Sequence, residues 1–168
     1  LLTVQGKTLF ERALEPFQEC FAQVMLIGDR PERFAGCNLP ILPDLYPGSS
    51  LGGLYTGLYH AGTENIFVTS CDLPFPSRAI LRYLCSMQGD WDAIVPESPQ
   101  GVEPLFACYR KSCLEAMKNQ LEQQRFSIFA ACSLLQTIHV PYQELEQFDP
   151  EGTAFLNLNT PLDIELLN

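Results

Sequence analysis

Short apolar runs of β-type residues alternate with amphipathic helical segments along this chain, and this alternation restricts the fold more than any other feature. Such a pattern is typical of α/β folds in which most of the sheet is parallel. We therefore predict one α/β domain over residues 1–168, a length that can bury a proper core. The strands are expected at residues 23–27, 39–42, 66–70, 93–95, 105–109, 137–140 and 155–158.

Two capping boxes, Thr8-x-x-Glu11 and Ser112-x-x-Glu115, predict the starts of two helices, because each pairs a hydroxyl with an acid three residues later. Pro16 is expected to kink or shorten the first of these helices. The chain opens only a few residues before that helix, so the strand that normally starts a nucleotide-binding α/β unit is expected to be missing or truncated. The other helices are predicted at residues 51–61, from 77, at 127–135 and from 160.

The charge and the cysteines limit the partners and the compartment. Twenty acids against ten bases give a net charge of −10, whereas nucleic-acid binding needs clustered Lys and Arg. No apolar run approaches the roughly 18 residues of a membrane span. We therefore expect neither nucleic acid nor a membrane as a partner. Seven cysteines without a C-x-x-C pair predict neither a disulfide framework nor a zinc site, and we assign the cytoplasm.

Asp72 is the first candidate for chemistry, because it follows directly on the predicted strand at residues 66–70. Ligands of open parallel sheets bind beyond the carboxyl ends of the strands. A single carboxylate at that place suits Mg²⁺, which takes one or two protein carboxylates beside substrate phosphates. The alternative is that Asp72 only caps the turn before Ser77.

Two further segments carry candidate ligand groups. The stretch from Asp44 to Gly53 contains glycines that enter a helix, where backbone N–H groups can approach an anion. Asn157 and Asn159 alternate along a predicted strand and so share one face. Each segment also has an ordinary interpretation, as a surface loop and as strand-end hydrogen bonding respectively. Glu103 is interpreted as a turn acid.

Taken together, these segments resemble the MobA-like branch of nucleotidyltransferases, which includes the molybdenum cofactor guanylyltransferases. The resemblance covers residues 1–168, and its specific parts are the Cys-Asp-Leu-Pro and Asn-Leu-Asn-Thr-Pro elements. The segments that carry it are Gly6-Lys7-x-Leu9, Asp44 to Gly53, Cys71-Asp72-Leu73-Pro74-Phe75, Glu103-Pro104-Leu105-Phe106 and Asn157-Leu158-Asn159-Thr160-Pro161.

The resemblance implies a Rossmann-like, three-layer α/β/α fold and transfer of GMP from GTP to molybdopterin with release of pyrophosphate. It implies Mg²⁺ as the cofactor, held by Asp72, which would also be the catalytic residue and contact the triphosphate. Molybdoenzymes or other proteins of cofactor biosynthesis are the implied protein partners. The resemblance assigns nucleotide binding to Asp44, Leu51, Gly52, Gly53 and Asp72, and substrate binding to Pro74, Asn157 and Asn159.

The chain also departs from the family pattern. The family's Gly-rich phosphate loop, with its Arg and Lys, would precede Leu1, so we expect the chain as numbered to be inactive or very weak alone. Ser49-Ser50-Leu51 stands where relatives have Gly-Pro-Leu, and Gln124-Arg125-Phe126 replaces a basic turn. Two alternatives remain open: a variant that uses CTP, and a degenerate, non-catalytic module that binds molybdopterin or a partner protein.

Overall fold

The computed structural model describes residues 3–4, 7–28, 30, 34 and 36–156, and it confirms the α/β class. The helices are α1 (Leu9–Cys20), α2 (Ser50–His60), α3 (Arg78–Ser86), α4 (Cys113–Glu122), α5 (Ile128–Cys132), α6 (Tyr142–Leu145) and the 3₁₀ helix η2 (Glu146–Phe148). The strands are β1 (Thr3–Val4), β2 (Lys7–Thr8), β3 (Leu26–Ile27), β4 (Ile41–Leu42), β5 (Asn65–Thr69), β6 (Ala93–Ser98), β7 (Gly101–Val102), β8 (Phe106–Arg110) and β9 (Thr137–Val140).

The central sheet is mixed. Its strand order is β5-β8-β6-β7, with β9 paired to β6. Because β8 runs antiparallel to both β5 and β6, those two strands share one direction, and β9 runs parallel to β6. The expected parallel arrangement therefore holds for β5, β6 and β9. The reversal comes from a tight hairpin in which Ser98 pairs with Gly101, since so short a connection permits only antiparallel strands.

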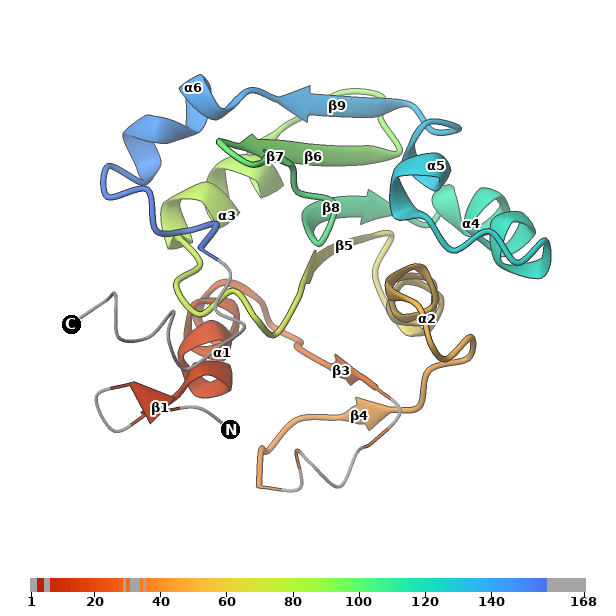
Figure 1. Ribbon diagram of the computed structural model, residues 1–168, viewed down its shortest axis with the longest axis horizontal. Helices are drawn as coiled ribbons and strands as arrows, with labels where there is room; N and C mark the ends of the chain where they lie inside the picture. The colour runs from red at the N-terminus through yellow and green to blue at the C-terminus, as the bar shows by residue number, and fades with distance from the viewer. Residues whose placement is uncertain (1–2, 5–6, 29, 31–33, 35, 157–168) are drawn as a thin grey trace.

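Side chains of the sheet alternate between two apolar clusters, which makes the molecule a three-layer sandwich (Figure 1). On β6, Ala93 and Val95 belong to the cluster with α2 and α4, whereas Ile94 belongs to the cluster with α1 and α3. On β8, Phe106 and Ala107 divide in the same way. This period of two buries both faces of the sheet.

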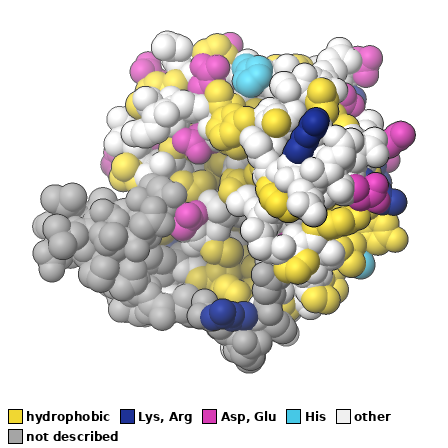
Figure 2. Space-filling view, turned by 45° about the vertical axis from the view of Figure 1, so that its right-hand side comes forward, with side chains coloured by type: hydrophobic (Ala, Val, Ile, Leu, Met, Phe, Trp, Pro, Cys, Tyr) yellow, Lys and Arg dark blue, Asp and Glu magenta, His cyan; other side chains and the backbone are white. Residues whose placement is uncertain are grey.

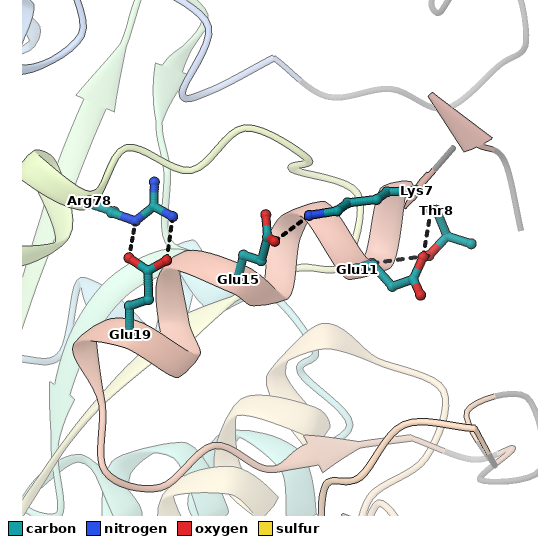
Figure 3. A network of polar contacts seen from close by, with 6 residues as sticks. All are labelled: Lys7, Thr8, Glu11, Glu15, Glu19 and Arg78. Atoms are coloured by element: carbon teal, nitrogen blue, oxygen red, sulfur yellow. Dashed lines mark hydrogen bonds and ion pairs between the residues drawn. The ribbon is translucent and has the colours of Figure 1, made fainter. Parts of the chain in front are cut away.

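Helix α1 is fixed at its start and tied to α3 by polar contacts (Figure 3). The backbone N–H of Glu11 donates to Thr8 Oγ1 at 3.1 Å, and the Glu11 carboxylate accepts from the Thr8 N–H at 2.8 Å, which confirms the first capping box. The Arg78 guanidinium of α3 donates to both carboxylate oxygens of Glu19. Pro16 lies inside α1 without ending it.

The second predicted helix start is confirmed, because α4 begins directly after Ser112, but the capping box itself does not form. Ser112 has helical backbone angles (φ −56°, ψ −24°) and not the extended backbone of an ordinary N-cap, and its hydroxyl donates to the carboxylate of Asp92 just before β6. Phe155 and Leu156 lie in a turn region rather than in the predicted strand. The strand prediction for 157–158 and the final helix from 160 fall outside the described residues.

Strands β3 and β4 form a separate parallel pair that packs beside α2. Between β3 and β5 lies a groove of about 1000 Å³, whose lining includes Phe17, Leu26, Ile66 and Val68. Figure 2 shows apolar side chains at the bottom of the hollow on one face of the molecule. Among the described residues, β5 is paired on its β8 side alone. The missing or truncated first strand stays a prediction.

None of the helices in the described ranges is long and apolar enough to cross a membrane.

Candidate active site

A pocket of about 780 Å³ lies beyond the carboxyl end of β5. Its walls come from the start of α2, the loop after β5, the β7–β8 connection, the start of α5 and the segment at Phe155. The pocket therefore lies where an open α/β sheet binds its ligands. Its volume is in the range of small-molecule sites.

Asp72 lies in this pocket with one carboxylate oxygen left without a partner. The residue is half-buried, and its Oδ1 is buried with no hydrogen-bond partner among the described residues. Helix α3 is capped by the Ser77 hydroxyl, which accepts from the Ile80 N–H at 3.4 Å, and the turn-cap alternative for Asp72 stays open. A buried acceptor without a partner costs about 1–3 kcal/mol. A cation at Oδ1 would remove that cost.

The loop that carries Asp72 is held by apolar anchors. Leu73, Pro74 and Pro76 are buried, and Leu73 packs in the core cluster with α1 and α3. Pro74 is not among the described residues that line the pocket, and substrate binding by Pro74 stays a prediction. Desolvation by neighbouring protein atoms raises the pKa of the Cys71 thiol, and the Asp72 carboxylate raises it further.

Glu103 is the second acid at the pocket, and its carboxylate already has a partner. The buried Ser98 hydroxyl donates to Glu103 Oε1 at 2.6 Å, and the Glu103 N–H donates to the carbonyl of Pro96 at 2.9 Å. This agrees with its interpretation as a turn acid. Asp72 and Glu103 are the charged side chains among the described lining residues, so the pocket is negative and an incoming polyphosphate needs a cation.

Asp44 lies outside the described lining of the pocket and stabilises a loop. Its Oδ1 accepts hydrogen bonds from the Tyr46 N–H at 2.9 Å and from Thr56 Oγ1 at 2.7 Å. Thr56 also accepts from the Leu45 N–H at 3.0 Å, so the loop is tied to α2. Nucleotide contact by Asp44 stays a prediction.

The three predicted nucleotide residues on α2 also have structural tasks. Leu51 is completely buried in the core. Gly52 packs against the loop so closely that a Cβ atom would lie 2.0 Å from the carbonyl oxygen of Tyr46. Gly53 faces the groove beside β3 and not the pocket. Ser49 and Ser50 line the pocket instead, and Ser49 caps α2 by accepting from the Gly52 N–H at 3.0 Å.

Asn157 and Asn159 lie outside the described residues, but Phe155 and Leu156 just before them line the pocket. Sequence reasoning did not single out several of the lining residues, among them the aromatic Phe126 and Phe129. Phe126 comes just before the predicted helix at 127–135 and Phe129 lies within it, where an apolar side chain is usually a core residue. The sequence signal that could have drawn attention to Phe126 was the departure from the family pattern, in which Gln124-Arg125-Phe126 replaces a basic turn.

The comparisons with known proteins agree with this geometry. Residues 1–137 match the model of the MobA-like NTP transferase domain. A molybdenum cofactor guanylyltransferase of Desulfosudis oleivorans is 30% identical over 164 residues, which are 96% of this chain and 81% of that protein. A probable molybdenum cofactor guanylyltransferase of Natranaerobius thermophilus is 32% identical over 172 residues, 98% of this chain and 84% of that protein.

Solved structures show the same fold. Molybdopterin-guanine dinucleotide biosynthesis protein A from Archaeoglobus fulgidus has a TM-score of 0.83 and 26% identity, with 98% of this chain and 86% of that chain covered. A cytidylyltransferase from Thermus thermophilus, 16% identical with a TM-score of 0.67 over 98% of this chain and 89% of its own, shares the fold alone.

The fold and the acidic pocket beyond β5 define an α/β protein of the nucleotidyltransferase type. The match over residues 1–137 makes the assignment specific: the chain belongs to the MobA-like NTP transferase family.

Proposed function

We propose that this protein transfers GMP from GTP to the terminal phosphate of molybdopterin and releases pyrophosphate. The relatives named molybdenum cofactor guanylyltransferase, at 30% and 32% identity, support this activity. The observation that carries it is the partnerless carboxylate oxygen of Asp72 in the pocket beyond β5. A cytoplasmic location belongs to the same proposal and agrees with the seven cysteines, which are all unpaired.

A single Mg²⁺ ion in this pocket belongs to the same proposal. The free acceptor of the pocket is Asp72 Oδ1, whereas the Glu103 carboxylate is already engaged by Ser98. Mg²⁺ takes one or two carboxylates and keeps waters and substrate phosphates as its other ligands. When bound, the ion neutralises phosphate charge and orients the reacting groups. Asp72 would hold it.

The reaction needs little proton transfer from the protein. A phosphate oxygen of molybdopterin attacks the α-phosphorus of GTP, a new P–O bond forms, and the bond to the bridging oxygen of pyrophosphate breaks. The attacking phosphate is already ionised at neutral pH, so no histidine base is required. Residues of the chain then act by positioning: Asp72 on the metal side and Ser49 and Ser50 at the start of α2.

The experiment compares pyrophosphate release from GTP and from CTP in the presence of molybdopterin and Mg²⁺, using the full-length protein. We expect release with GTP, and a loss of about 100-fold or more in kcat/KM for Asp72→Asn. Asp90→Asn is the matched control, because it removes one negative charge from a side chain that is 96% exposed and outside the pocket lining.

Each contrary result has a definite meaning. Preference for CTP would replace guanylyl transfer by cytidylyl transfer. Absence of release with both nucleotides would favour the non-catalytic binding module. Turnover of Asp72→Asn at the level of Asp90→Asn would remove Asp72 from the reaction.

A further inference from the structure

Two aromatic side chains at the rim of the pocket are exposed to solvent. Phe126 is 53% exposed and Phe129 is 59% exposed, and both line the pocket that contains Asp72. Neither ring contacts another aromatic ring within the part of the chain that the structure describes. Apolar surface of this size is normally removed from water, so an exposed aromatic pair in a pocket indicates a ligand contact.

The backbone fixes both rings in place. The turn after α4 is a Schellman motif, in which the Arg125 N–H donates to the Gln120 carbonyl at 2.9 Å and the Gln124 N–H donates to the Leu121 carbonyl at 3.0 Å. The chain leaves this turn directly into Phe126.

Helix α5 then anchors the segment from its other side. The Ser127 hydroxyl caps the helix by accepting from the Ala130 N–H at 3.2 Å. Ile128 and Ala131 are buried in the core cluster with α2 and α4. Since these residues hold the helix to the core, Phe126 and Phe129 remain on the pocket side.

The surroundings of the two rings indicate the chemistry of the ligand. A flat apolar surface favours a planar ring, because aromatic stacking gains contact without fixing many rotatable bonds. With Asp72 assigned to the metal, Glu103 keeps a second carboxylate oxygen that can accept hydrogen bonds, because the Ser98 hydroxyl donates to its Oε1. None of the described lining residues has a cationic side chain, and the other polar ones are Gln100, Ser49, Ser50, Ser70 and Ser127. A ring with several N–H donors along one edge satisfies both conditions.

We propose that Phe126 and Phe129 form a stacking platform for a fused 2-amino-4-oxo-pyrimidine ring, the chemistry that pterin and guanine share. This inference rests on the proposed function only for the choice of that ring among planar heterocycles. The platform is a binding element that positions the substrate.

The test measures ring binding without any transfer reaction. The probes are 6-carboxypterin, followed by its own fluorescence, and GMP, followed by calorimetry, each titrated into the full-length protein. We expect Phe126→Ala with Phe129→Ala together to weaken one of the two probes by about 10- to 100-fold. The probe that is weakened identifies the source of the ring, pterin or guanine.

Three further variants separate stacking from other effects. Leu134→Ala is the matched control, because Leu134 is 60% exposed in the same region but is not among the described pocket residues. It should leave both affinities unchanged. Phe126→Tyr with Phe129→Tyr should retain binding. Phe126→Leu with Phe129→Leu should lose it, since leucine keeps apolar area and lacks a planar ring.

Unchanged affinity for both probes in the double Ala variant overturns the platform, and so does an equal loss in Leu134→Ala. A change of oligomeric state in the double variant with unchanged affinities assigns the surface to self-association and also overturns it. The protein could bind one of the ring probes through the two phenylalanines and yet show no transferase activity. That result would overturn the proposed function and support the platform.

Discussion

Gly52 has no room for a side chain, because the backbone of Tyr46 lies directly against it. A side chain there would place its Cβ 2.0 Å from the carbonyl oxygen of Tyr46 and 2.9 Å from the carbonyl carbon. Backbone atoms cannot rotate away as a flexible side chain does, so the 44–46 loop or α2 would have to move. The adjacent Gly53 has much more room, with Asp44 Oδ2 at 3.9 Å from its would-be Cβ.

This contrast gives a paired prediction. Gly52→Ala should lower the free energy of unfolding by about 1–3 kcal/mol, because the loop must be displaced. Gly53→Ala should raise it by up to about 1 kcal/mol, because alanine is the better helix former. Urea unfolding of both variants measures the two effects. Equal stability of the two variants would show that the close approach of Gly52 to Tyr46 is wrong.

Within the described part of the chain, the end of α4 contains the one residue other than glycine that has a positive φ. Gln124 has φ of +58°, in the left-handed region, at the position of the Schellman turn that glycine usually occupies. The turn is formed despite the missing glycine because Arg125 and Gln124 both find carbonyl partners in α4.

Gln124→Gly should therefore stabilise the protein by about 0.5–1 kcal/mol. Gln123→Gly is the matched control, because Gln123 has φ of −86° and gains nothing from glycine. The melting temperatures of the two variants report the difference. A lower melting temperature for Gln124→Gly than for the wild type would contradict the strained turn.

Asp92 joins three elements and makes their packing dependent on pH. Its carboxylate accepts from the hydroxyl of Ser112 before α4 and from the backbone N–H of Gln136 before β9. The Ser112 hydrogen bond is the largest cause that lowers the pKa of Asp92, followed by the Gln136 N–H. A carboxyl whose pKa is lower in the folded state contributes stability above its unfolded pKa.

We expect Asp92→Asn to be less stable than the wild type at pH 7. The difference should shrink as the pH falls below about 4, because the unfolded chain then binds a proton at Asp92 while the folded state, in which the pKa is lowered, does not. Urea unfolding at several pH values measures it. A constant difference between pH 7 and pH 3 would contradict the role of the charged carboxylate.

The two capping boxes show how far element prediction from sequence reaches. Thr8-x-x-Glu11 and Ser112-x-x-Glu115 are the same local pattern, and only the first forms. The second does not form because Ser112 has helical backbone angles, whereas Thr8 has the extended backbone of an N-cap. The local pattern therefore predicts both helix starts, but the cap hydrogen bonds also depend on the backbone conformation of the first residue.

At the scale of the whole molecule, the sequence predicted the α/β class and the position of Asp72 beyond a strand. It did not predict the reversed strand β8, because direction depends on the hairpin at Ser98–Gly101. Nucleotide binding by Leu51 and Gly52, which the resemblance implies, stays a prediction, and their burial against the core and the loop depends on packing between distant segments. The aromatic pair at the pocket rim was missed for the same reason.

The central claim is that Asp72 holds the metal that allows this acidic pocket to accept a nucleotide. The Mg²⁺ dependence of GTP binding tests it most directly. In the wild-type protein, Mg²⁺ should strengthen GTP binding by about tenfold or more. Glu103→Gln should keep that enhancement, since its carboxylate is engaged by Ser98. In Asp72→Asn the enhancement should fall below about threefold, without loss of metal-free affinity, because one repelling charge is gone. Wild-type enhancement by Mg²⁺ in Asp72→Asn would contradict the account.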